Sequence, residues 1–210
     1  MRKRERSVVA ARPFGLLVLA MLGLGAGCTS SASDRPRIDK PPEASIRICH
    51  GHGCARRTRV DLDGATMQKL AALMAPGKGS ADAERRAISA AVQYFERQST
   101  AIIGVRDAPK SAFAATAVPK GQMDCIDEST NTRALLLQLQ ARGLLKHHVV
   151  ERNVSRGFFA DGRYPHFTAV IRDTAGAKRS VDSWFEAAGG APDIWPLPVW
   201  QARGVAGERY

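Results

Sequence analysis

A change of hydrophobic period along the chain restricts its fold more than any other feature. Three segments place apolar side chains three and four residues apart, which predicts helices: residues 65–75, 81–98 and about 124–142. Three later segments have the pattern of strands: residues 148–154, 166–172 and 179–185. Helices followed by antiparallel strands predict an α+β fold, with the N-terminal helices packed on a small antiparallel sheet.

The first 27 residues have the order of an export signal. A basic start, MRKRER, precedes an apolar run over residues 14–24 and then small residues before Cys28. The run is shorter than the roughly 20 residues that a spanning helix needs. The small residues ending in Cys28 resemble the lipobox of bacterial lipoproteins, in which this cysteine is lipidated and becomes the mature N-terminus. The alternatives are an ordinary cleaved signal and an uncleaved anchor.

The lipobox resemblance implies a protein attached to a membrane through a lipid on Cys28, with its domain facing the periplasm of a bacterial cell envelope. Residues 28–44 carry Ser, Pro and charge without an apolar period, which predicts a disordered tether. Residues 45–210 are then a single domain. Residues 1–27 contribute +4 of the net charge of +11, so +7 remains. The Arg and Lys are scattered, and we expect no nucleic-acid partner.

The four cysteines are divided by position. With Cys28 assigned to the lipid, Cys49 and Cys54 stand five residues apart, and exported thiols tend to pair. A local disulfide is therefore predicted. Zinc bound with the help of His50 and His52 is the alternative, but so tight a cluster would wrap one ion poorly. We therefore predict no metal and no cofactor.

Cys125 is then left without a partner, so it is either buried and inert or kept for its chemistry. It begins the predicted helix 124–142, and a helix N-terminus lowers a thiol pKa and offers donors to an oxyanion. His166 begins an alternating strand with a hairpin behind it. If the turn is centred near residues 174–175, Asp182 or its immediate neighbour faces His166. Together they would form a nucleophile, a base and an orienting carboxylate.

This order resembles the transglutaminase-like branch of the papain-like cysteine enzymes. The matching stretches are DCIDESTNTRALLLQLQARGLLKHHVV, PHFTAVIRD and SVDSWF, within about residues 120–186. The resemblance implies a papain/transglutaminase-like core, with Cys125, His166 and Asp182 as catalytic residues. It also implies hydrolysis or acyl transfer at an amide or ester of a peptide or protein substrate. The whole chain further resembles proteobacterial lipoproteins of this type.

Acidic residues around the thiol depart from the family pattern. Asp124, Asp127 and Glu128 would raise the pKa of Cys125, unless they cap the helix. Gln122 is a candidate oxyanion donor, or else a loop residue facing water. The acidic setting favours a second hypothesis, a catalytically inactive binding or assembly lipoprotein with the same fold.

Overall fold

The computed structural model describes residues 45–105, 107, 122–157 and 165–203. The predicted signal peptide 1–27, the tether 28–44 and the lipidation residue Cys28 lie outside these ranges. Within them, no helix is both long and apolar enough to cross a membrane.

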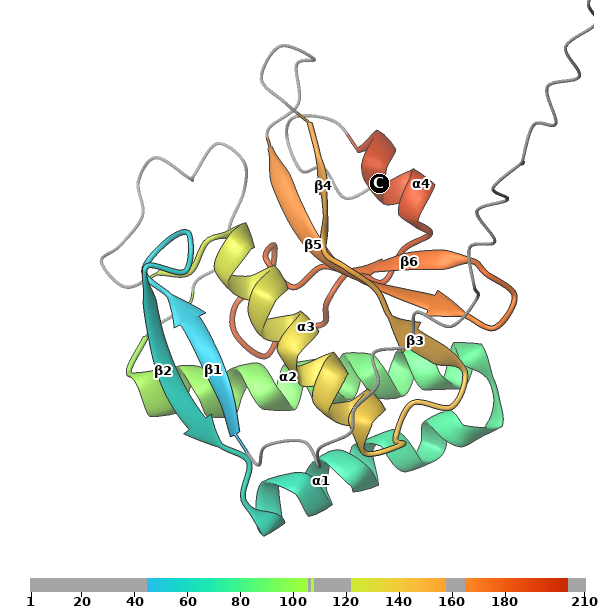
Figure 1. Ribbon diagram of the computed structural model, residues 1–210, viewed down its shortest axis with the longest axis horizontal. Coiled ribbons are helices and arrows are strands. Elements are labelled where there is room, and N and C mark those ends of the chain that lie inside the picture. The colour runs from blue at the N-terminus through green and yellow to red at the C-terminus, as the bar shows by residue number, and fades with distance from the viewer. Residues whose placement is uncertain (1–44, 106, 108–121, 158–164, 204–210) are drawn as a thin grey trace, which may run out of the picture. The chain divides into compact units, whose positions relative to one another are not determined.

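The described residues form a mixed helical and antiparallel structure, an α+β fold (Figure 1). In chain order the strands and helices are β1 (Ser45–His50), β2 (Arg56–Asp61), α1 (Gly64–Met74), the 3₁₀ turn Ala75–Gly79, α2 (Ala81–Ile103), α3 (Cys125–Ala141), β3 (His148–Val150), β4 (Val154–Arg156), β5 (His166–Asp173), β6 (Lys178–Val181) and α4 (Leu197–Ala202).

The three predicted helices are present, and each begins at a side-chain cap. The Asp63 side chain accepts from the Thr66 amide at the start of α1, and Ser80 accepts from Ala83 at the start of α2. Helix α2 runs five residues beyond the predicted end, to Ile103, and stops at Gly104. Gly104 adopts a left-handed φ of 69°, which glycine accepts without strain.

The N-terminal hairpin corrects the expected order of helices first and strands second. Strands β1 and β2 pair antiparallel before the first helix, a pairing that the hydrophobic pattern did not predict. Ile46, Ile48 and Val60 are buried on one face of this hairpin. The hairpin is therefore a second small sheet that contributes to the core, rather than a loop in front of it.

Strand β5 organises the other sheet. It pairs antiparallel with β3 and β4, which together take the place of the single predicted strand 148–154, and with β6. The predicted strand 179–185 ends at Val181, because the chain bends after Asp182. The chain beyond this sheet contains the short helix α4.

Helix α3 lies at the centre of the fold. It packs against β1 on one side and β5 on the other, with α2 behind it in Figure 1. Its Leu135, Leu136 and Leu139 are fully buried in the main core, as the sequence predicted. The first residue of α3 and the first residue of β5 are Cys125 and His166.

Candidate functional site

Cys125 is the first residue of α3, and its position is fixed by a capping box. Asp124 is the N-cap, and its side chain accepts from the Asp127 backbone N–H at 2.8 Å. The Asp127 carboxylate accepts in return from the Asp124 N–H at 3.2 Å. Two of the acids beside the thiol therefore stabilise the helix start, as one of the two sequence interpretations held.

The same two carboxylates also bind the loop that joins β1 to β2. The backbone N–H groups of His52 and Cys54 donate to Asp127 at 2.9 and 2.6 Å, and that of Gly53 donates to Asp124 at 2.8 Å. Residues 51–54 all have positive φ, between 60° and 84°. Successive left-handed residues turn their N–H groups to one side and form an anion-binding concavity. The negative charge near Cys125 is thus partly compensated.

The predicted disulfide between Cys49 and Cys54 is present and closes this loop. Since both sulfur atoms are bonded to each other, neither is a thiolate able to bind zinc. His50 Nε2 lies 2.9 Å from Thr58 Oγ1 instead. Among the described residues, no group of three or more His, Cys, Asp or Glu side chains is arranged to hold a metal ion.

The Cys125 side chain is mostly buried, with 8% of the residue exposed, beside Phe167, Trp184 and Phe185. Burial raises the pKa of the thiol to about 11, and the charges of Asp124 and Asp182 add to the increase. The backbone amide of Phe167 hydrogen-bonds the sulfur and opposes this change. Since Phe167 follows His166 directly, the sulfur lies beside the start of β5.

His166 is buried, and aromatic rings surround its imidazole. The ring centroids of Trp184, Phe185 and Trp200 lie 4.9, 5.1 and 5.7 Å away. Nε2 of His166 lies 2.7 Å from Oδ2 of Asp182. Nδ1 is buried and has no hydrogen-bond partner among the described residues. One nitrogen of the ring is therefore oriented by a carboxylate while the other remains available.

Asp182 meets His166 by a different route from the one predicted. The β5–β6 hairpin pairs Arg172 with Lys178 and Ala169 with Val181, so its turn is centred on residue 175. Continuing this register would place Trp184, rather than Asp182, opposite His166. Asp182 instead lies just beyond β6, where its backbone bridges to Asp193. The expected contact exists, but the strand register that predicted it was wrong.

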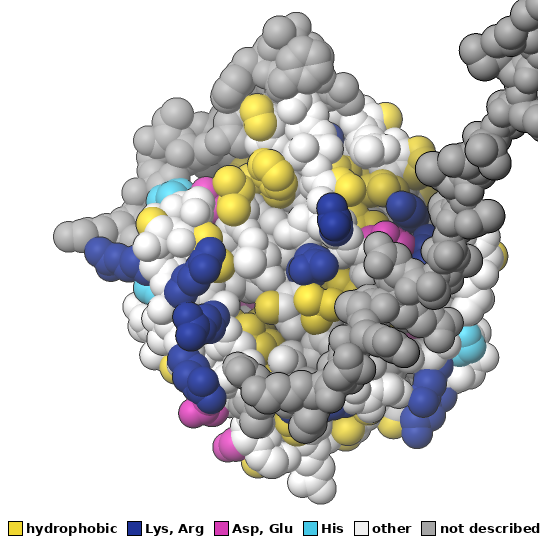
Figure 2. Space-filling model, viewed as in Figure 1, with side chains coloured by type: hydrophobic (Ala, Val, Ile, Leu, Met, Phe, Trp, Pro, Cys, Tyr) yellow, Lys and Arg dark blue, Asp and Glu magenta, His cyan; other side chains and the backbone are white. Residues whose placement is uncertain are grey.

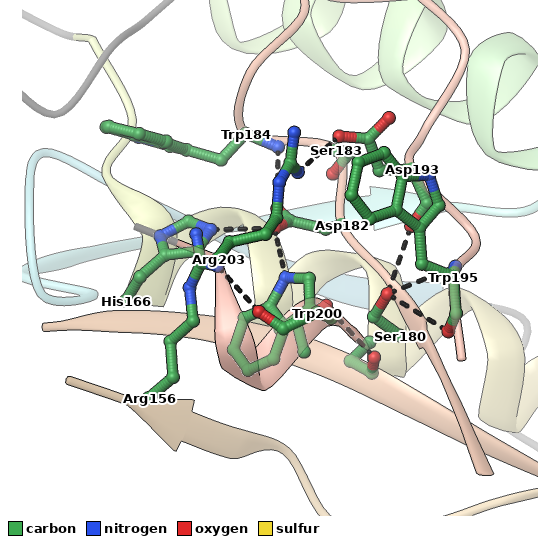
Figure 3. A network of polar contacts seen from close by, with 12 residues as sticks. Arg156, His166, Ser180, Asp182, Ser183, Trp184, Asp193, Trp195, Trp200 and Arg203 are labelled. Atoms are coloured by element: carbon green, nitrogen blue, oxygen red, sulfur yellow. Dashed lines mark hydrogen bonds and ion pairs between the residues drawn. The ribbon is translucent and has the colours of Figure 1, made fainter. Parts of the chain in front are cut away.

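The Asp182 carboxylate has three hydrogen-bond donors (Figure 3). Besides His166, the Trp200 indole Nε1–H donates to Oδ2 at 2.7 Å, and the Trp184 backbone N–H donates to Oδ1 at 3.3 Å. Burial alone would raise the pKa of Asp182, but His166 and these donors hold it below its ordinary value. The carboxylate therefore stays charged and holds the imidazole in one orientation.

Sequence reasoning missed the part played by Trp200 in this site. Trp200 is fully buried in α4. Arg156, paired with His166 across β4 and β5, donates to the Trp200 carbonyl at 2.6 Å and lies over its ring at 4.7 Å. The stretch DIWPLPVW, residues 193–200, is rich in Pro and Trp, but nothing in its spacing indicates which group the indole would reach.

Gln122, the predicted oxyanion donor, is buried rather than facing water. Its side-chain Nε2 donates to Asp107 Oδ1 over 3.4 Å. It lies three residues before Cys125, on the segment that leads into α3.

Comparisons with protein-family models, with curated proteins and with solved structures found no match to this chain.

Proposed function

We propose that the protein is a thiol hydrolase or acyltransferase acting on peptide or amide bonds, with Cys125, His166 and Asp182 as its catalytic residues. The observation that carries this proposal is the state of His166. One ring nitrogen is bound to a buried carboxylate, and the other is unpartnered beside the strand residue that contacts the sulfur. A buried imidazole with one nitrogen oriented and one available has the geometry of a general base.

The resting thiol is protonated at neutral pH, because its pKa is about 11. Catalysis therefore begins with transfer of the thiol proton to Nδ1 of His166 as the sulfur attacks the substrate carbonyl carbon. The oxyanion that forms accepts from the Cys125 backbone N–H at the helix start and from the Gln122 amide. His166 thus removes the proton as the sulfur attacks, and no thiolate needs to be present before the substrate binds.

The second half of the reaction restores the enzyme. The tetrahedral intermediate collapses, the carbon–nitrogen bond breaks, and His166 gives its proton to the leaving amine. The acyl group remains on Cys125 as a thioester. Attack by water releases an acid, and attack by a second amine gives a new amide. In either case a proton returns to the sulfur.

The arrangement of elements supports a papain/transglutaminase-like core as part of this proposal. A central helix begins with the cysteine, and it packs against a strand that begins with the histidine. The carboxylate follows just beyond β6, the strand that pairs with β5. The signal-like residues 1–27 and Cys28 support a lipid-anchored protein facing the periplasm, whose substrate is a peptide or protein of the cell envelope.

A second candidate function is binding without catalysis. The burial of Cys125 and the raised pKa of its thiol favour it, since both oppose thiolate formation. In that case the residues around Cys125 and His166 stabilise a fold whose role is to bind a partner in the envelope.

Acylation by p-nitrophenyl acetate distinguishes the two candidates. The enzyme releases a stoichiometric burst of p-nitrophenol, whereas Cys125→Ser gives none. His166→Gln slows the burst by about 10²-fold, the usual contribution of a general base. His147→Gln is the matched control, because this histidine binds a backbone carbonyl of the 3₁₀ turn, Lys78 O, through Nε2. A wild-type burst that is absent, or equal in folded His166→Gln, would leave only the binding protein.

A further inference from the structure

An open groove lies between α3 and the segment that connects β3 to β4. Its volume is about 430 Å³, within the range of small-ligand sites. Six residues line it: Thr130, Arg133, Ala134, Leu137, Arg152 and Asn153. Figure 2 views the face of the molecule that carries α3, and Lys or Arg side chains stand there beside hydrophobic ones near the centre. The lining combines two cations, two apolar side chains and two polar ones.

A β-bulge brings the second wall of the groove into place. Val150 pairs with Ile171 and Val154 pairs with Thr168, so three residues, 151–153, stand opposite only two residues of β5. The extra residue interrupts the ladder between β3 and β4, although the Glu151 N–H still donates to Val170 O. Bulges redirect side chains and are frequent beside functional sites. Here the bulge contributes Arg152 and Asn153 to the groove.

The two guanidinium groups have no carboxylate partner in the described part of the chain. Arg133 uses Nε to donate to the Glu151 backbone carbonyl at 2.8 Å. The Glu151 carboxylate is itself bound by Arg172 at 2.6 Å and lies 3.9 Å from Lys178. Exposed Arg152 makes no ion pair there. Two adjacent uncompensated guanidinium groups favour a ligand carboxylate, which they can bind through paired N–H donors.

Whereas the two arginines offer hydrogen-bond donors, Asn153 offers an acceptor without a partner in the described part of the chain. Its Oδ1 is buried and receives no donor from the described residues. A buried acceptor without a partner costs free energy that a ligand N–H can recover. The backbone amide of a peptide supplies such a donor next to an acidic side chain. Ala134 and Leu137 supply apolar contact for the intervening carbons.

The face of α3 that lines the groove leads back toward the start of the helix, where Cys125 lies. Ile126, the residue after Cys125, is 37% exposed, and Thr130, Arg133 and Leu137 follow it at helical spacings of four, three and four. Arg133 is eight residues beyond Cys125, about 12 Å along the helix axis. That is about four residues of an extended peptide.

We propose that this groove binds an acidic peptide, with its carboxylates on Arg133 and Arg152 and one backbone N–H on Asn153. Taken with the proposed function, which it extends, the groove selects substrates that carry a carboxylate about 12 Å from the scissile bond. The binding step itself does not depend on catalysis and can be measured without it.

Calorimetric titration of the full chain tests the proposal. The probe is acetyl-Leu-Glu-Ala-Glu-amide, and its neutral counterpart is acetyl-Leu-Gln-Ala-Gln-amide. All titrations use a Cys125→Ser background, so that no peptide is consumed. We expect the acidic peptide to bind about tenfold more tightly than the neutral one. Arg133→Ala, Arg152→Ala and Asn153→Asp should each remove most of that preference, the last by placing a carboxylate in the groove.

Arg59→Ala is the matched control, because this exposed arginine on β2 lies outside the groove and pairs with Asp61. Equal affinity for the two peptides overturns the proposal. Loss of the preference in Arg59→Ala as large as in Arg152→Ala also overturns it, since the attraction would then be general. If the acidic peptide binds as expected but p-nitrophenyl acetate gives no burst, the groove stands and the proposed catalysis fails. A burst without peptide selectivity gives the reverse result.

Discussion

The hydrogen bond from Trp200 to Asp182 offers the sharpest test of the proposed site. Trp200→Phe keeps an aromatic ring in α4 but removes the indole N–H that lies 2.7 Å from Oδ2. Asp182 is charged and buried, so water cannot replace the donor that the substitution removes, and Oδ2 loses one of its hydrogen bonds. Hydrogen bonds to charged groups are worth about 1.5–3 kcal/mol. We expect Trp200→Phe to lower the free energy of unfolding by about that amount at pH 7.

The pH dependence of this loss identifies its cause. The pKa of Asp182 is below its ordinary value in the folded protein, so its charge contributes stability above the unfolded pKa. That contribution disappears as pH falls through the folded pKa. The cost of Trp200→Phe should therefore be largest near pH 7 and shrink in acid, as the carboxylate takes up a proton below the ordinary range of an aspartate.

Urea unfolding at a series of pH values from 7 to 3 measures this cost. Trp195→Phe is the matched control, because Trp195 packs in the same cluster and lies under Arg203, whereas its indole is not one of the donors found for Asp182 among the described residues. A cost of Trp200→Phe that stays constant with pH would show that the ring packing matters and the charge does not. The reasoning would also fail if Trp195→Phe showed the same pH profile.

Two further predictions concern contacts that support the site from a distance. The fully buried Glu84 accepts from the His147 backbone at 2.9 Å and lies 2.7 Å from Nδ1 of His148. Burial alone would raise the pKa of Glu84, but these partners hold it below its ordinary value, so its stabilisation is lost as pH falls. Glu84→Gln should lower the free energy of unfolding by about 3 kcal/mol at pH 7 and by less in acid, as measured by urea unfolding. An equal loss at both pH values would contradict this. The Asn131 side chain accepts from the Cys49 N–H and donates to the Cys49 carbonyl. Asn131→Ala should therefore lower the free energy of unfolding by about 2 kcal/mol and speed hydrogen exchange in β1. Unchanged exchange would contradict this prediction.

The disulfide loop changes how the acids around Cys125 should be interpreted. From the sequence, Asp124 and Asp127 looked like charges that oppose a thiolate. In the fold, the Asp124 charge does raise the thiol pKa, but burial is the larger cause. Both carboxylates receive backbone N–H groups from residues 52–54, more than 70 positions away in the chain. Their primary roles are therefore to cap α3 and to bind the loop.

Local chemistry in the sequence determined where the main elements begin. Asp63, Ser80 and Asp124 are side chains that satisfy free N–H groups at a helix start, and each one is an N-cap. The alternation in HFTAVIRD predicted β5, and the five-residue spacing of Cys49 and Cys54 predicted the disulfide. These features depend on neighbours within a few residues, which a sequence pattern records directly.

Only the tertiary structure decided which distant groups meet. The β1 strand, the bulge at 151–153 and the indole donor on Asp182 depend on partners that no local period specifies. The register of β5 and β6 shows why: moving the centre of the turn by one residue moves the partner of His166 by two, from Asp182 to Trp184. Asp182 reaches His166 because the chain bends after β6. The bend is stabilised by backbone hydrogen bonds with Asp193 and by the Trp200 indole, rather than by the β5–β6 hairpin.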